Sequence, residues 1–329
     1  MALSNKKIWA LLDDRQGNTN QTLGVAEALG VPFETREIRF NNLIRIPNII
    51  TNNTKMWAKG NTSALLESPW PDIVISTARR LGIAASYIKR QNPGTFIAQI
   101  QWPGFPSSQF DLIAAPKHDN VKMADNIFIT VGAPHRVEQD KLVREAEIWR
   151  ATVANLPAPR IAVLVGGDSG SRTFSVEHAK NFAELISQFA STVGGSLMAT
   201  TSRRTSRPAA KTIAQALTVP HYYHYWDEAK STTGNPFYGF LGLADAVIAT
   251  GDSISMCSEA CATGKPVYIY SSPEFVSSKH QQFIDELYAI GVAKPLLAEG
   301  NTMFTPSPLL NDSQAVADEI KKRYLARLI

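Results

Sequence analysis

Short apolar runs alternate with helix-like segments along the first half of the chain. Short apolar strands separated by helices are typical of a parallel sheet covered on both faces, so this pattern predicts an α/β unit. The strand candidates are residues 7–12, 72–77, 95–100, 110–116 and 126–131, and the helix candidates are Gln21–Leu29, Leu81–Arg90 and Glu138–Ala154.

The same pattern starts again after the segment "LPAPR" at 156–160, which we interpret as a linker. Strand-like runs follow at "RIAVLVGG", "GSLMATTS", "HYYHY", "DAVIATG" and "PVYIY". The sequence therefore predicts an α/β fold with two Rossmann-like parallel-sheet domains, residues 1–155 and 156–310, and a C-terminal helix within 311–329. The two sheets are expected to face a central cleft at the carboxyl ends of their strands, where open α/β sheets bind ligands.

Composition limits the class of protein. No apolar run approaches the roughly 20 residues of a membrane span, and the polar start "MALSNKK" lacks the apolar core of a secretory signal, so we expect a cytoplasmic protein.

Cys257 and Cys261 lie four positions apart in a predicted helix. They are expected to be buried small side chains, since no nearby His or Cys would complete a metal site.

Positive charge is concentrated in the first half of the chain, although the net charge is only +4. The stretch from Ile38 to Leu66 contains no acidic residue, and its arginines and lysines are interleaved with apolar residues. Such a stretch could lie against an anionic membrane surface or a lipid-linked acceptor, or it could be a solvated loop with a few core anchors. Nucleic acid is disfavoured as a partner, because there is no dense Lys/Arg stripe.

Two strand ends of the second half predict phosphate-binding groups. The strand "DAVIAT" turns directly into a helix that carries Ser253, Ser255 and Glu259. Amides and hydroxyls at a helix start can hold an anion, and a carboxylate further in can accept from a pair of ribose hydroxyls. The glycine-rich turn "VGGDSGSRTFS" at 165–175 includes Gly167 and Ser169. A capped helix and a plain tight turn are the structural alternatives.

Two further loops of the second half carry polar side chains after a strand. Arg203 and Arg204 stand in "TTSRRTS", and guanidinium groups match the oxygens of a diphosphate, although they could equally be solvated surface charges. Gln281 and Gln282 stand in "SSKHQQFIDEL", just before an amphipathic helix, and could bind sugar hydroxyls. Polar residues are also common at helix starts for reasons of solvation alone.

Candidate general bases lie in the first half. Asp13 and Asp14 follow the first predicted strand, and one of these carboxylates, Asp14 in particular, could take a proton from an acceptor. His118 and Asp119 in "APKHD", and His135 in "GAPHRV", are rivals at other strand ends.

The order of the four loops in the second half resembles the donor half of GT-B glycosyltransferases, and in particular the bacterial N-acetylglucosaminyltransferase of peptidoglycan lipid synthesis. That resemblance implies a nucleoside diphosphate held by the glycine loop and by the helix with the ribose-binding glutamate, and a donor sugar contacted by a glutamine pair. It also implies a last helix that packs back on the first domain. The roles would fall on Gly167 and Ser169, on Ser253, Ser255 and Glu259, and on Gln281 and Gln282.

A second resemblance covers nearly the whole chain, from Trp9 to about Pro295. The motifs "DDRQGNTNQTLGVAEALG", "PDIVISTARR", "PKHD", "TVGAPHRV", "GGDSG", "TTSRRT" and "GDSISMCSEACATGKPVYIY" look like the mitochondrial-fission "elongate mitochondria" domain family, which includes bacterial members and a plant fission factor. The first-domain loop departs from the peptidoglycan enzyme, which has a His where this chain has "DDRQ", so the base is the least supported role.

Two functions follow as hypotheses. The first is a GT-B-type glycosyltransferase that works without a metal cofactor, with a nucleotide sugar as donor, UDP as its nucleotide, and a cell-envelope lipid or glycan as acceptor. Helix starts and Arg203 with Arg204 would stabilise the leaving diphosphate, and no Asp-x-Asp motif is present to hold a metal ion. The alternative is a non-catalytic nucleotide-binding module at the inner face of a membrane.

Overall fold

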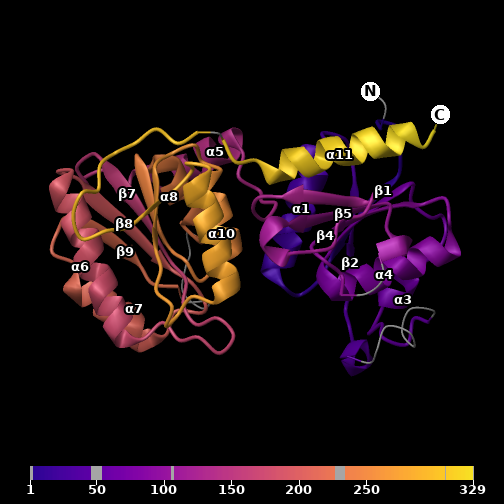
Figure 1. Cartoon of the computed structure of the whole chain (residues 1–329), viewed down its shortest axis with the longest axis horizontal. Coiled ribbons are helices and arrows are strands. Elements are labelled where there is room, and N and C mark those ends of the chain that lie inside the picture. Colours follow the sequence, from indigo (N-terminus) through magenta and orange to yellow (C-terminus); the bar gives the residue numbers. More distant parts are fainter. Residues whose placement is uncertain (1–2, 46–53, 105–106, 227–233, 308, 329) are drawn as a thin grey trace. The chain divides into compact units, whose positions relative to one another are not determined.

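The computed structural model describes residues 3–45, 54–104, 107–226, 234–307 and 309–328. The chain divides into two compact units. The first unit consists of Met1–Arg136 together with Asn311–Ile329, and the second of Val137–Leu310. Each unit is an α/β structure built on one parallel sheet (Figure 1).

Six parallel strands form the sheet of the first unit within the described residues, in the order β2-β1-β3-β4-β5-β6. The order reverses between β1 and β3, because β2 lies on one side of β1 and all later strands on the other. The elements are β1 (Ile8–Leu12), α1 (Gln16–Ala28), β2 (Glu34–Glu37), η1 (Asn42–Arg45), α3 (Thr62–Leu65), β3 (Ile73–Thr77), α4 (Ala78–Gln91), β4 (Phe96–Ile100), η2 (Ser107–Gln109), β5 (Leu112–Pro116), η3 (Lys117–Asp119), β6 (Ile127–Thr130) and α11 (Asp312–Ala326).

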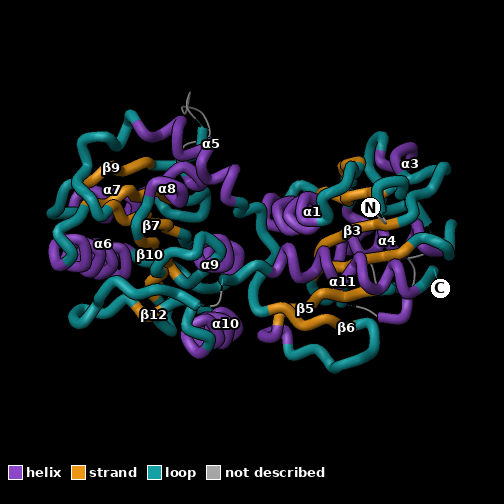
Figure 2. The backbone as a smooth tube through the Cα atoms, turned by 90° about the horizontal axis from the view of Figure 1, so that it is seen from above, coloured by secondary structure: helices purple, strands orange, loops and turns teal. Residues whose placement is uncertain are grey.

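Successive side chains along each strand point to opposite faces of this sheet, so each face has its own hydrophobic core. In β1, Ile8 and Ala10 point into the core beneath α1 and α11, whereas Trp9 and Leu11 point into the core beneath α4. Helix α11 packs beside α1, although the two are far apart in sequence (Figure 2). Val316, Ile320 and Tyr324 on one face of α11 are buried, whereas Leu328, beyond the end of the helix, is exposed.

The start of α11 is fixed to the segment where the chain leaves the first unit. The Asp312 carboxylate accepts from the amides of Val131 and Gly132 at 3.0 and 2.8 Å. The hydroxyl of Ser313 donates to the carbonyl of His135 and accepts from its amide, at 2.6 and 2.7 Å. Burial raises the pKa of Asp312 to about 6. The two places where the chain enters and leaves the first unit are therefore tied together.

The sheet of the second unit, within the described residues, has the order β12-β11-β10-β7-β8-β9, and all its strands are parallel. Read from β9, this is the Rossmann order 3-2-1-4-5-6, with its switch point between β7 and β10. The elements are α5 (Gln139–Arg150), β7 (Arg160–Val165), α6 (Val176–Thr192), β8 (Ser196–Thr201), α7 (Arg207–Ala216), β9 (His221–His224), α8 (Phe237–Leu243), β10 (Ala246–Thr250), α9 (Ile254–Cys261), β11 (Val267–Tyr270), α10 (Ser278–Ala289) and β12 (Lys294–Pro295).

The prediction of two Rossmann-like parallel-sheet domains is confirmed by these two sheets. The division between the units lies before α5, whereas the sequence placed it at the 156–160 linker. Helix α5 packs on α8 of the second unit, where Trp149 contacts the ring of Phe240 at 5.7 Å between centroids. Cys257 and Cys261 are free and buried in α9, as expected.

The basic and apolar stretch from Ile38 to Leu66 is in part an anchor for the first unit, and its residues 46–53 lie outside the described residues. Ile38, Ile44 and Trp57 are buried in the core, whereas Met56 is 64% exposed. In the part of the chain that the structure describes, no helix combines the length and the apolar character that a membrane span requires.

Candidate functional site

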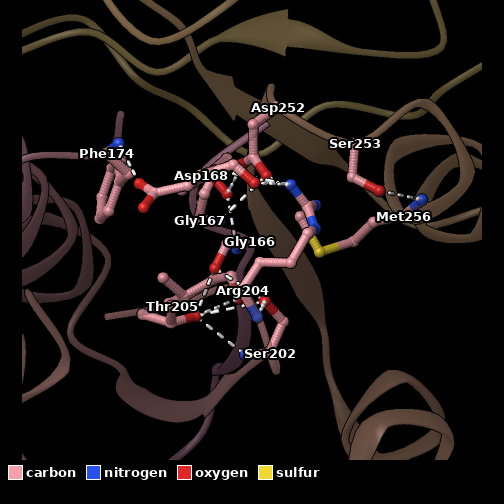
Figure 3. A network of polar contacts seen from close by, with 12 residues as sticks. Gly166, Gly167, Asp168, Phe174, Ser202, Arg204, Thr205, Asp252, Ser253 and Met256 are labelled. Atoms are coloured by element: carbon pink, nitrogen blue, oxygen red, sulfur yellow. Dashed lines mark hydrogen bonds and ion pairs between the residues drawn. The ribbon is translucent and has the colours of Figure 1, made fainter. Parts of the chain in front are cut away.

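The loops that follow β7, β8 and β10 meet at the carboxyl edge of the second sheet, and the buried carboxylate of Asp252 joins them (Figure 3). Its Oδ2 accepts from the amide of Gly167 at 2.9 Å, and its Oδ1 accepts from the hydroxyl of Thr250 at 2.6 Å. Thr250 in turn accepts from the amide of Gly166 at 2.8 Å. This network fixes the turn at the start of α9 against the glycine loop.

Both glycines are required by close packing. A Cβ on Gly166 would lie 2.1 Å from the Asp252 carboxylate, and one on Gly167 would lie 2.1 Å from the carbonyl oxygen of Arg204. The amides of Gly166 to Ser169 all donate to groups of the second unit itself. The glycine loop therefore differs from the expectation for Gly167 and Ser169, because its amides are already used inside the protein.

The two adjacent arginines have different surroundings. The guanidinium of Arg204 forms an ion pair with Asp252 at 2.7 Å and donates to the carbonyl of Asp168 at 2.9 Å, so Arg204 joins the β7 and β8 loops. Arg203 is exposed, and no ion pair or hydrogen bond of its side chain is found among the described residues. Of these two arginines, Arg203 is thus the one whose guanidinium is not engaged within the described residues.

The first turn of α9 presents hydrogen-bond donors at the switch point. Ser253 is the N-cap, and its hydroxyl accepts from the amide of Met256 at 3.4 Å. The amides of Ile254 and Ser255 belong to the first turn, where no helical partner exists, and no acidic side chain lies there. A helix start of this kind attracts an anion.

Glu259 lies further along α9 and is 7% exposed. Its Oε1 accepts from the hydroxyl of Tyr238 on α8 at 2.9 Å, and no hydrogen bond to Oε2 is found in the described part of the chain. The ammonium group of Lys141 on α5 lies 3.4 Å from the centre of the Tyr238 ring. Burial raises the pKa of Glu259 to about 7, against the opposing effects of Tyr238 and Lys141. This carboxyl group can therefore change its charge near neutral pH.

The start of α10 lies near the same network. Gln281 donates to Asp285 at 2.8 Å along the helix, whereas the neighbouring Gln282 is exposed. Burial lowers the pKa of His280, and the charges of Asp252 and Arg204 act on it in opposite directions. His280 is therefore close to the Asp252 network, and its burial makes the imidazole harder to protonate.

Asp14, a candidate base in the first unit, is already paired. Arg80 forms ion pairs with Asp14 and with Asp13, the latter at 2.7 Å. The hydrogen bond from Arg80 is the main cause that lowers the pKa of Asp14, which weakens this carboxylate as a proton acceptor. His118 and Asp119 lie at the end of β5, with His118 Nε2 3.9 Å from the carboxylate of Asp119, and His118 is buried.

The family model for mitochondrial fission ELM1 matches residues 16–324. The chain belongs to this family. An uncharacterized protein of Rickettsia prowazekii is 29% identical over 348 residues, which cover 95% of this chain and 97% of the relative. The mitochondrial fission protein ELM1 of Arabidopsis thaliana is 27% identical over 285 residues, which cover 79% of this chain and 66% of the relative.

Solved structures of other proteins share the fold of this ELM1-family chain. The UDP-GlcNAc 2-epimerase of Methanocaldococcus jannaschii superposes with a TM-score of 0.51 at 12% identity, over 96% of this chain and 99% of that chain. The UDP-GlcNAc 2-epimerase of Neisseria meningitidis bound to UDP-GlcNAc superposes with a TM-score of 0.52 at 14% identity, over 96% of this chain and 90% of that chain. These similarities show the fold, a GT-B-type pair of Rossmann-like units.

Two residues of the candidate site in this ELM1-family chain were not identified from the sequence. Asp252 stands in the "TGDS" turn, and a carboxylate directly after a buried strand was a signal that could have found it. Tyr238 lies in an apolar segment with no polar pattern, so no signal in the sequence points to its contact with Glu259.

Proposed function

We propose that the second unit binds a nucleoside diphosphate sugar, with a UDP-sugar as the first candidate, and that the protein is a GT-B-type glycosyltransferase. The observation that carries the proposal is Glu259, a buried carboxylate behind the start of α9 at the switch point of a Rossmann sheet. Tyr238 holds one of its oxygens, so the other can accept from the hydroxyls of a ribose. The UDP-GlcNAc in the Neisseria meningitidis structure, which has the same fold, supports this ligand class.

The diphosphate would lie at the start of α9. There it can accept from the amides of Ile254 and Ser255 and from the Ser255 hydroxyl, with Arg203 as the neighbouring positive charge. Gln282, which is exposed near the start of α10, would contact the sugar. Charge that develops on the leaving diphosphate during transfer would be stabilised by fixed donors of this kind. A cell-envelope lipid or glycan is the acceptor class we propose, received by the first unit.

The non-catalytic alternative is favoured by one observation, the ion pair between Asp14 and Arg80. A carboxylate whose pKa is lowered is a poor base, so the fold could bind a nucleotide without turnover at a membrane surface. Incubation of the protein with UDP-GlcNAc and membrane lipid extract distinguishes the two functions. Release of UDP with sugar in the lipid fraction supports the enzyme, whereas tight binding without release of UDP supports the module.

Glu259→Gln is expected to weaken UDP binding about 10- to 100-fold, because a hydrogen bond to a charged group contributes about 1.5–3 kcal/mol. The amide keeps the volume of the side chain but replaces the free acceptor with a donor. Calorimetric titration with UDP, GDP, ADP and CMP measures the change. Glu184→Gln on the exposed face of α6 is the matched control and should bind like the natural protein. If both variants bind UDP with equal affinity, Glu259 is not part of the UDP site.

The affinity for UDP-GlcNAc should rise with pH. The pKa of Glu259 is raised to about 7, and the protonated group cannot accept both ribose hydroxyls as well as the ionised one. Since the ionised fraction increases about tenfold between roughly pH 6 and pH 8, the affinity should increase by up to that factor. UDP-GlcNAc is the suitable ligand because its two phosphate groups do not titrate in this range. A Glu259→Gln variant with the same pH dependence would contradict the assignment.

A further inference from the structure

A pocket lies at the switch point of the first sheet. It has a volume of about 250 Å³ and is lined, within the described residues, by Arg15, Asn18, Ile44, Ala78, Arg79 and Arg80. Apart from Ile44 in η1, these residues follow β1 and β3, the two strands between which the order of the sheet reverses. Ligands of open α/β sheets bind outside the carboxyl ends of the strands at such a point. Its position therefore indicates a ligand site that is separate from the one in the second unit.

Positive charge dominates the lining. Three guanidinium groups line the pocket, and the nearby carboxylates are those of Asp13 and Asp14 on the β1 loop, both paired with Arg80. Asp13 has a side chain with 0% exposure and also accepts from the amide of Arg15 and from Asn18. Three guanidinium groups against these two carboxylates leave an excess of one positive charge around the pocket. The excess of positive charge would favour an anionic ligand.

The remaining two arginines are placed differently. Arg79 donates to the carbonyl of Ile44 at 2.9 Å, which fixes its side chain at the wall of the pocket. Arg15 is exposed, and no hydrogen bond or ion pair of its guanidinium is found in the residues that the structure describes. One arginine is thus preorganised and the other is available to close on a ligand.

The backbone supports the same chemistry. Helices α1 and α4 both begin at this edge, without an acidic residue in the first turn and without a side-chain cap. Their first amides thus add partial positive charge to that of the arginines. Ala78, which lines the pocket and opens α4, has a φ of 59°, a left-handed conformation that costs a non-glycine residue about 1–2 kcal/mol.

We propose that this pocket binds the phosphate or diphosphate group of a ligand, held by Arg15 and Arg79. The volume is below the roughly 300–1,000 Å³ of sites for whole small molecules, so it suits an anionic head group with the rest of the ligand outside. The phosphate could belong to a lipid head group or to a free phosphorylated compound. The site does not depend on nucleotide binding by the second unit.

Calorimetry with inorganic pyrophosphate tests the site on the full chain. Arg15→Gln and Arg79→Gln should each weaken binding of pyrophosphate about tenfold or more, because each removes a charge-assisted hydrogen bond. Arg15 is exposed, so its variant should fold normally, which a thermal melt verifies. Arg327→Gln, which changes an exposed arginine of the same unit outside the pocket, is the matched control and should bind like the natural protein.

Crossing the variants separates this proposal from the function of the second unit. Arg203→Gln should weaken the binding of UDP and leave most of the pyrophosphate binding. Arg15→Gln should weaken the binding of pyrophosphate and leave the binding of UDP unchanged. Loss of pyrophosphate binding in Arg203→Gln with normal binding in Arg15→Gln and Arg79→Gln would overturn the proposal, as would no binding to the natural protein.

Flotation with phosphatidylcholine vesicles, with and without phosphatidic acid, identifies the source of the phosphate. Binding that requires phosphatidic acid and is lost in Arg15→Gln supports a lipid head group. Pyrophosphate binding without vesicle binding supports a free phosphorylated ligand. Vesicle binding that is unchanged in both arginine variants, together with unchanged pyrophosphate binding, would contradict the site.

Discussion

Replacing Asp252 with alanine is expected to lower the free energy of unfolding of the second unit by about 3 kcal/mol or more. The carboxylate holds the amide of Gly167, the hydroxyl of Thr250 and the guanidinium of Arg204. Each buried group left without a partner costs about 1–3 kcal/mol, and the cost for Arg204 is reduced because its side chain is 35% exposed to water. Urea unfolding followed by circular dichroism measures the change.

Asp252→Asn is the informative comparison. Gly167 and Arg204 both meet Oδ2, so an amide oxygen at that place keeps an acceptor for two of the three donors. The amide removes the charge that pairs with Arg204, so the loss of stability should be present but smaller than that of the alanine variant. Because Asp252 also fixes the start of α9, both variants should weaken UDP binding. A change below about 1 kcal/mol in the alanine variant would mean that water replaces these contacts and that the network does not hold the loops.

Replacing Arg80 with glutamine should destabilise the first unit by about 3–5 kcal/mol, the usual effect of removing one partner from a buried ion pair. Asp13 has a fully buried side chain, and only the amide of Arg15 and the side chain of Asn18 would remain as donors to it. Chemical unfolding followed by tryptophan fluorescence reports mainly on this unit, because four of the six tryptophans belong to it and two of these, Trp9 and Trp57, lie in its core.

A double-mutant cycle tests the origin of this loss. The variant Asp13→Asn with Arg80→Gln removes the buried charge together with its partner, so it should recover part of the stability lost in Arg80→Gln. Asp14→Asn is the control, since the side chain of Asp14 is 79% exposed and its pair with Arg80 should contribute less than about 1 kcal/mol. Equal losses from Asp13→Asn and Asp14→Asn would contradict the assignment of Asp13 as the buried partner.

Local patterns in the sequence determine most of the fold. Runs such as Ile73–Thr77 and Ala246–Thr250 are continuous and apolar because both faces of a parallel sheet are covered, and such runs can be recognised without a structure. The division between the units could not be predicted in this way. The periodicity of residues 138–154 shows that the helix buries one face, but the partner of that face, α8, is distant in sequence.

The candidate site could be predicted only as far as its loops. The sequence identified the turns after β7, β8, β10 and β11, since glycine, serine and arginine residues after a strand are local signals. Which of their groups are used inside the protein depends on contacts between loops, such as the pair between Arg204 and Asp252. Helix α8 was not predicted, because its segment is apolar with two glycines and has no clear period, and so the contact of Tyr238 with Glu259 was missed.

The C-terminal location of α11 has a consequence for biosynthesis. Residues 3–136 emerge first from the ribosome, but the apolar face beneath α11 stays uncovered until Val316, Ile320 and Tyr324 have been translated. The second unit is continuous in sequence, so its core needs no segment beyond residue 310. A chain that ends before residue 312 should therefore expose a hydrophobic surface on the first unit, whereas the second unit keeps every segment of its own core.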